Sequence, residues 1–236
     1  MNLTLTLSPL QLDVLWESRQ AGEAPYPLLV PPQGTTESER RRLCRQAHEE
    51  LRDRGLLEAD GRLDPELDAV LAALADARRS VDSVFVPAVG AELVRAVAAA
   101  GRGRGVLAVQ DGAGVTLRRV EHTGLASAVV DLLPPAPRGT ERALTMPAAE
   151  FAGADARLVG LPSLRAGQLA ANSRDALGGR RRSPVLVWFD NETGRYFGHT
   201  RKARDGHEWT TVAPADAATL RVRLSEMMAA VTDDDR

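Results

Sequence analysis

The residues best suited to chemistry are four histidines, one cysteine and many carboxylates and arginines. His48, His122, His199 and His207 lack the spacing of metal ligands, and none belongs to an H-E-x-x-H motif. Cys44 is the only cysteine, which excludes an intramolecular disulfide and a thiolate metal cluster. We therefore expect no metal site, and we expect Cys44 to be a packed thiol on a helix.

No catalytic or cofactor-binding motif is present. The stretch Gly101–Gly105 reads G-x-G-x-G, but it does not stand between a strand and a helix as a phosphate-binding loop does. The sequence contains no G-K-[ST] and no G-x-S-x-G. Asp and Glu are plentiful, yet their spacing alone singles out no acid/base pair. The sequence therefore predicts a binding protein that is not an enzyme, with no catalytic residue and no cofactor.

Aromatic residues gather in one stretch. The chain has three Trp, two Tyr and four Phe, and five of these lie close together: Trp188, Phe189, Tyr196, Phe197 and Trp209. Alternation along two strands puts neighbouring aromatic side chains on opposite faces of a sheet. One face can enter the core, and the other would be covered either by a helix of the same chain or by a partner. Exposed aromatic groups would suit a docked helix, because Trp and Tyr anchor interfaces at low entropic cost.

Three consecutive arginines, Arg180–Arg182, precede a predicted strand. They fit a solvated turn that protects a sheet edge, or contact with an acidic partner or a nucleic-acid backbone. The helix pair predicted over 36–77 can also be read as part of a winged-helix DNA reader, but its second helix presents Glu66 and Asp68 where a reader needs basic residues. The net charge of -2 lacks the basic excess of nucleic-acid binders. A DNA- or RNA-binding regulator is therefore the alternative reading.

Two stretches share one design of strand, turn, strand and amphipathic helix. The first contains strands over 105–110 and 115–121, followed by a helix with Thr123 as its N-cap. The second contains strands over 184–190, 195–201 and 207–212, followed by a helix that Pro214 would open. Its apolar face carries Leu220, Leu224, Met227, Met228 and Val231. Strands over 79–87 and 167–174 would extend the two units, which predicts an internal duplication with halves at about 79–133 and 167–231.

The remaining stretches add helices and edges around these units. A strand over 2–7 precedes a helix that Ser8 and Gln11 open as a capping box, and two further helices are predicted over 36–54 and 64–77. The proline-rich stretch 25–32 is typical of an extended arm or edge strand. Residues 91–100 have helix propensity, but the repeat favours a strand, which we choose. A short strand over 142–146 and a helix near 148–151 complete the pattern.

Composition is that of an ordinary globular domain. With 236 residues and 44% hydrophobic content, the chain is long enough for one sizeable core, and we expect a single domain over 1–236. No run approaches the roughly 18 apolar residues of a membrane span. The N-terminus shows neither a basic region nor an apolar stretch typical of export, which favours a cytoplasmic protein without membrane contact.

Several segments, taken in order, resemble one known family. They are LTLSPLQLDVLWE, PYPLLVPPQGTTESERRRL, LRDRGLLEADGRLDPELDAVL, GRYFGHTRK and WTTVAPADAATL. The series resembles the EspG family of secretion-associated chaperones of type VII (ESX) systems in actinobacteria. The resemblance implies an α+β fold with a central antiparallel sheet, flanked by helices and of quasi-twofold symmetry.

The resemblance also implies a function. A cytosolic monomer or homodimer of this family binds the apolar tip of a secreted helical client, PE-PPE-like or WxG-type, and keeps it soluble until export. It points to the loop between the first two strands of the first unit and to the C-terminal helix with the adjoining sheet face. The expected partner-binding residues are Pro87, Val89, Gly90, Trp188, Phe197 and Trp209.

Overall fold

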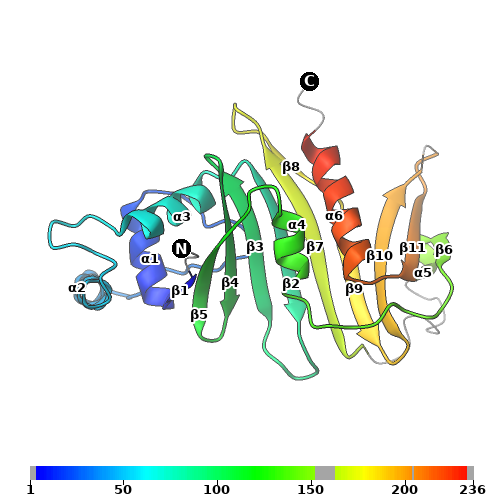
Figure 1. Cartoon of the computed structure of the whole chain (residues 1–236), viewed down its shortest axis with the longest axis horizontal. Coiled ribbons are helices and arrows are strands. Elements are labelled where there is room, and N and C mark those ends of the chain that lie inside the picture. Colours follow the sequence, from blue (N-terminus) through cyan, green and yellow to red (C-terminus); the bar gives the residue numbers. More distant parts are fainter. Residues whose placement is uncertain (1–3, 152–162, 204, 233–236) are drawn as a thin grey trace.

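The protein is α+β and is built on one long antiparallel sheet (Figure 1). A computed structural model describes residues 4–151, 163–203 and 205–232, and within them the sheet has 11 strands in the order β1-β5-β4-β3-β2-β7-β9-β10-β11-β6, with β8 paired to β7 beside this path. Every pairing along the path is antiparallel. The expected fold class is confirmed.

The N-terminal region supplies an edge strand and three helices. Its elements are β1 (Thr4–Leu7), α1 (Pro9–Ser18), α2 (Glu37–Asp53) and α3 (Pro65–Ala75). The helix starts follow from the capping residues, since Ser8 and Gln11 form the capping box and Thr36 and Asp64 accept backbone N–H groups of the first turns. The proline-rich stretch 25–32 contains no strand in the structure, and its Leu29 backbone is held instead by the Gln110 side chain.

The first unit forms four strands and a short helix. These are β2 (Arg79–Val86), β3 (Val94–Gly101), β4 (Arg104–Asp111), β5 (Gly114–Val120) and α4 (Leu125–Val130). The strand predicted over 91–100 is confirmed from Val94 onward despite its helix-forming alanines, because both faces of β3 are buried and only a paired strand satisfies its backbone there. Residues 91–93 precede the strand. The predicted cap Thr123 is wrong, since Gly124 occupies the N-cap position without a side-chain hydrogen bond.

The second unit and its neighbours follow the sheet to its other edge. They are β6 (Leu144–Pro147), α5 (Ala148–Phe151), β7 (Arg165–Arg174), β8 (Arg180–Arg182), β9 (Leu186–Asn191), β10 (Gly194–Lys202), β11 (Glu208–Pro214) and α6 (Ala217–Thr232). Pro214 ends β11 and does not open α6. The helix begins later because Asp216 accepts hydrogen bonds from the Thr219 backbone and hydroxyl. The arginines Arg180–Arg182 form a strand instead of a turn.

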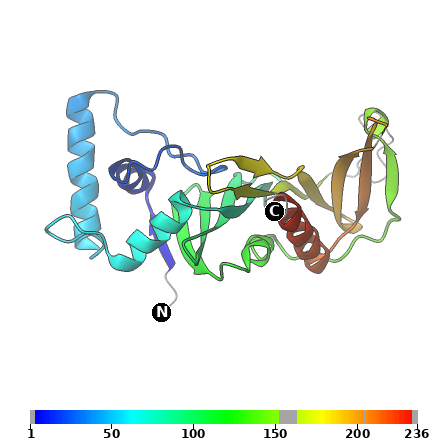
Figure 2. The ribbon, with the colours of Figure 1, turned by 90° about the horizontal axis from the view of Figure 1, so that it is seen from above.

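The strand order mirrors itself about the β2–β7 pair. On one side β2, β3, β4 and β5 follow in turn, and on the other β7, β9, β10 and β11 do the same. Each series is followed by a helix, α4 or α6, and the two helices contact each other on one face of the sheet (Figures 1 and 2). A duplication would produce this order, and the duplication itself stays a prediction.

The two faces of the sheet carry different cores. On one face, α1 and α3 cover β3, β4 and β5 through a cluster that includes Leu12, Leu71 and Val106. On the opposite face, α4 and α6 cover the centre through a cluster that includes Val129, Leu169 and Leu224. Alternate side chains of β3 enter the two clusters, which is the period of two expected of a strand buried on both faces.

A buried ion pair joins the second unit to the linker that precedes it. The Arg195 guanidinium donates to both carboxylate oxygens of Asp190, at 2.7 and 2.8 Å, and to the Pro134 carbonyl oxygen at 2.6 Å. It also lies over the Trp188 ring, 4.8 Å from the ring centre. Arg195 is 2% and Asp190 4% exposed. The pair therefore fixes the β9–β10 hairpin and the linker relative to each other.

Leu224→Asp is expected to unfold the protein. Leu224 is fully buried between α6 and the sheet, and an unpaired buried charge costs roughly 3–5 kcal/mol of the free energy of unfolding. Thermal denaturation followed by circular dichroism measures the effect. Val222→Asp is the matched control, because Val222 lies on the same helix and is 57% exposed. Equal stability of the two variants would mean that the helix does not pack as described.

Arg195→Met is expected to lower the free energy of unfolding by roughly 3–5 kcal/mol, because it leaves the buried Asp190 carboxylate without its main partner. Arg165 approaches the same carboxylate at 3.6 Å but has a side chain that is 31% exposed. Arg165→Met should therefore cost less than about 1 kcal/mol. Urea denaturation of both variants measures the difference, and equal losses would contradict the assignment of Arg195 as the main partner.

Candidate functional site

Residues 87–93 connect β2 and β3, and this loop, which begins with Pro87–Gly90, projects from one end of the sheet (Figure 1). Val89 is 78% exposed at its tip. Gly90 has a φ of +76°, which closes the turn without the strain that a side chain would bring. Leu93 and Leu164, which flank β3 and β7 at the same end, are 37% and 43% exposed. We name this surface, made of Pro87–Gly90, Leu93 and Leu164, the loop end.

Trp188 and Phe197 do not lie on an exposed face, so their prediction as partner contacts is wrong. Trp188 is 1% and Phe197 3% exposed, because both point to the face of the sheet that α6 covers. The indole lies against Phe85, with ring centres 6.0 Å apart. Gly167 leaves room for it, since a Cβ there would stand 2.8 Å from the Trp188 Nε1. Both side chains belong to the buried cluster that also contains Leu220 and Leu224 of α6.

The other aromatic face is covered by the linker ahead of β6. Gly139 lies against the Tyr196 ring, and a Cβ on it would come within 2.3 Å of the ring. The Tyr196 hydroxyl accepts the backbone N–H of Glu141, and the Gly139 N–H donates to the Arg195 carbonyl oxygen. Phe189 stacks on Tyr196 from the neighbouring strand. The sequence left two possibilities for this face, a helix of the same chain or a partner. The same chain covers it, but with a linker instead of a helix.

Trp209 is partly exposed but lies far from the loop end. Its side chain is 41% exposed on β11, opposite Pro147 of β6, where it lines a cavity of about 490 Å³ with Ala148 and His207. The β2 strand has 8 residues, so the loop end and the opposite end of the sheet, here called the far end, are about 26 Å apart at 3.3 Å per residue. Because Trp209 belongs to the far end, the structure does not bring Val89 and Trp209 together. Trp209 stays a predicted contact.

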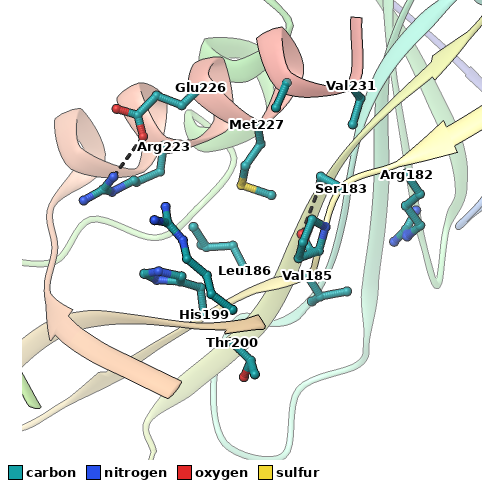
Figure 3. A pocket seen from close by; sticks show the side chains of 13 residues that line it. Arg182, Ser183, Val185, Leu186, His199, Thr200, Arg223, Glu226, Met227 and Val231 are labelled. Carbon is teal, nitrogen blue, oxygen red and sulfur yellow. Dashed lines mark hydrogen bonds and ion pairs between the residues drawn. The ribbon is translucent and has the colours of Figure 1, made fainter. Parts of the chain in front are cut away.

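An apolar groove lies between α6 and the strands below it (Figure 3). It encloses about 330 Å³, and we name it the α6 groove. Apolar side chains make its floor and walls: Pro184, Val185, Leu186, Met227, Ala230 and Val231. The groove is accessible because the sheet opens here. On one side β8 pairs with β7, on the other the end of β10 pairs with β11, and among the described residues no strand lies between β8 and the end of β10.

Charged side chains surround the α6 groove, and most of them form ion pairs or contact an aromatic ring. Arg223 donates to Glu226 and lies over the Phe197 ring. His199 stacks on the same Phe197 ring, with ring centres 5.7 Å apart. Burial lowers the pKa of His199 below its ordinary value, and the positive charges of Arg201 and Arg223 lower the pKa further. The imidazole is therefore neutral at neutral pH, and the groove presents an apolar floor with a cationic rim.

The described residues contain no metal-binding cluster. No group of three or more His, Cys, Asp or Glu side chains within them is arranged to hold a metal ion. None of the helices in the described part of the chain has the length and apolar character needed to cross a membrane.

The helix α3, the reading helix of the alternative interpretation, presents no cationic surface. Leu67, Leu71 and Leu74 of α3 are buried against the sheet. Its outward side carries Glu66 and Asp68, which pair with Arg119 and Arg19. A DNA-reading helix needs basic and polar side chains on its free face, and α3 offers carboxylates there.

The family resemblance pointed to the C-terminal helix with its adjoining sheet face, where the α6 groove lies, but sequence reasoning named none of the groove residues as contacts. It also missed Leu93 and Leu164. Leu93 lies in the same β2–β3 connection as Val89, whereas Leu164 comes beside this loop only because Val86 pairs with Ala166 of a strand distant in sequence. The two predicted strands left a turn between them, and the family resemblance singled out Pro87–Gly90 as a contact.

Comparisons with known proteins give a similar fold and one family. A search of curated proteins gave no match. The described fold is similar to that of the Mycobacterium tuberculosis type VII secretion system chaperone EspG5, solved in complex with a PE25-PPE41 dimer. The two chains share 16% sequence identity with a TM-score of 0.65, and the similarity covers 97% of this chain and 96% of the other. The sequence model of the EspG family matches residues 8–226, which is most of the sequence. This chain belongs to the EspG family.

Proposed function

We propose that this protein is a cytosolic, non-enzymatic chaperone of a type VII secretion system. It binds the apolar tip of a helical PE-PPE-like client and keeps the client soluble until export. The observation that carries the proposal is membership of the EspG family over 8–226. The similarity in fold to EspG5, a chaperone solved with a PE25-PPE41 dimer, supports the client class.

The loop end is the proposed contact surface. Val89, Leu93 and Leu164 expose apolar side chains at one end of paired strands. The strands hold these side chains in position, so no folding step has to precede client binding. Burying such side chains contributes about 1.5–3 kcal/mol each when burial is complete. A helical tip would cover them as part of an interface of roughly 1,200–2,000 Å². An apolar contact of this size holds a client firmly and leaves no covalent bond to break at release.

A pull-down from the native cytoplasm tests the function itself. The tagged protein should recover a helical PE-PPE-like client in a stoichiometric complex that survives high salt, because apolar contacts are not screened by ions. Mass spectrometry identifies the client, and size-exclusion chromatography shows whether one or two chaperone chains take part. Recovery of a WxG-type protein would support the chaperone function and assign it a different class of client. Recovery of nucleic acid alone would favour the alternative of a DNA- or RNA-binding regulator.

Val89→Asp is expected to weaken client binding by about tenfold or more, since it places a charge in an apolar interface. Folding should be unchanged, because Val89 is 78% exposed. Ala230→Asp is the matched control, since Ala230 is an exposed residue that lines the α6 groove away from the loop end. Isothermal titration with the purified client measures both. A loss of binding in Ala230→Asp with full binding by Val89→Asp would move the contact surface to the α6 groove.

A further inference from the structure

Three arginines stand side by side at the end of the sheet opposite the loop end. Arg174 pairs with Arg180 across β7 and β8. The backbone N–H of Arg174 donates to the carbonyl oxygen of Arg78, the residue that precedes β2. These three residues form one row across three adjacent strands, with neighbouring positions about 5 Å apart. We name them the arginine row.

The neighbouring row of Ser80, Asn172 and Arg182 shows on which face of the sheet the three arginine side chains lie. Asn172 donates to the Ser80 hydroxyl, and Arg182 donates to the Asn172 amide oxygen, so these three side chains share one face. The arginine row lies two residues further along each strand and therefore on the same face. That face lies opposite the one packed by α6. All three arginines line one cavity of about 550 Å³.

The arginine row lacks acidic partners in the described part of the chain. Arg182, by contrast, is neutralised by both carboxylate oxygens of the buried Asp82 and lies over the Tyr26 ring. Arg78, Arg174 and Arg180 form no ion pair with any described residue, and Glu23 is the only acidic residue that lines the cavity. Like charges placed directly opposite each other across strands are destabilising. An anion that bridges them would remove this cost.

We propose that the arginine row binds an acidic, extended segment of a partner protein. Carboxylates at every second position of an extended chain are about 6.6 Å apart, close enough to reach neighbouring guanidinium groups. This surface goes beyond the client contact, because it lies at the other end of β2 and β7.

A polypeptide fits this surface better than a nucleic acid does. The cluster of positive charge is local, while the whole chain carries a net charge of -2. The exposed aromatic ring nearby, Tyr26, is already covered by the Arg182 guanidinium and does not present a free face for base stacking on that side. The cavity also has an apolar wall from Leu74 and Pro25, which suits alternate apolar side chains of a peptide.

The test is a fluorescence anisotropy titration with a labelled peptide of alternating glutamate and serine. The wild-type protein should bind it, and the affinity should fall as salt rises. The double variant Arg174→Glu with Arg180→Glu should weaken binding by at least about tenfold, because two charge-assisted contacts become repulsive. The matched control is Arg42→Glu with Arg45→Glu on α2, which changes the net charge equally at exposed positions. It should bind like the wild-type protein.

Two results would overturn the inference. Equal binding by the wild-type protein and the Arg174/Arg180 variant would show that the row is not the site. Tighter binding of a single-stranded oligonucleotide of equal charge would make the surface a nucleic-acid site instead. Circular dichroism of each variant verifies folding, and client binding at the loop end should survive the Arg174/Arg180 changes. A failure of the peptide titration is therefore distinguishable from a failure of the proposed function.

Discussion

The hydrogen-bonded pair of Arg195 and Asp190 is the constraint on which the second half of the molecule depends. Both groups are buried, so neither charge is stable without the other. One guanidinium sets the β9–β10 register, holds the linker at Pro134 and covers the Trp188 ring. With these elements fixed, α6 has a rigid surface on which to pack. The exposed features that remain for partners are the ends and edges of the sheet.

The helices and strands were predictable where the interactions that start or end them lie within a few residues of sequence. Ser8, Thr36 and Asp64 cap helices that begin where the capping pattern places them. Pro214 misled because proline suits both a strand end and a helix start, and the Asp216 side chain decided between them. The strand at β3 was predictable only from the repeat, since burial on both of its faces overrides the helix propensity of its alanines.

The candidate site was less predictable, because exposure depends on contacts distant in sequence. Alternation correctly separates Trp188 from Phe189, but it does not tell which neighbour covers each face. The linker reaches Tyr196 through contacts such as that from Glu141, 55 residues earlier, and it can approach because Gly139 has no side chain. The turn at Val89 was visible locally, whereas Leu164 joins it only through the β2–β7 register. The arginine row likewise needs that register, although its Arg180 stood out in the sequence.

The two proposed surfaces lie at opposite ends of the same strands, and this arrangement decides how they interact. Coupling between two sites requires two conformations that the ligands bind with different affinity. β2 and β7 are paired with each other along eight consecutive residues, and Val81, Leu169 and Ala171 between the two ends are fully buried. Strands paired and packed in this way offer a single arrangement, so a ligand at one end has no alternative state to select. The sheet then acts as a rigid spacer, and a client at the loop end and an acidic segment at the arginine row would bind independently. A chaperone with this geometry can be recognised by a second protein without first releasing its client.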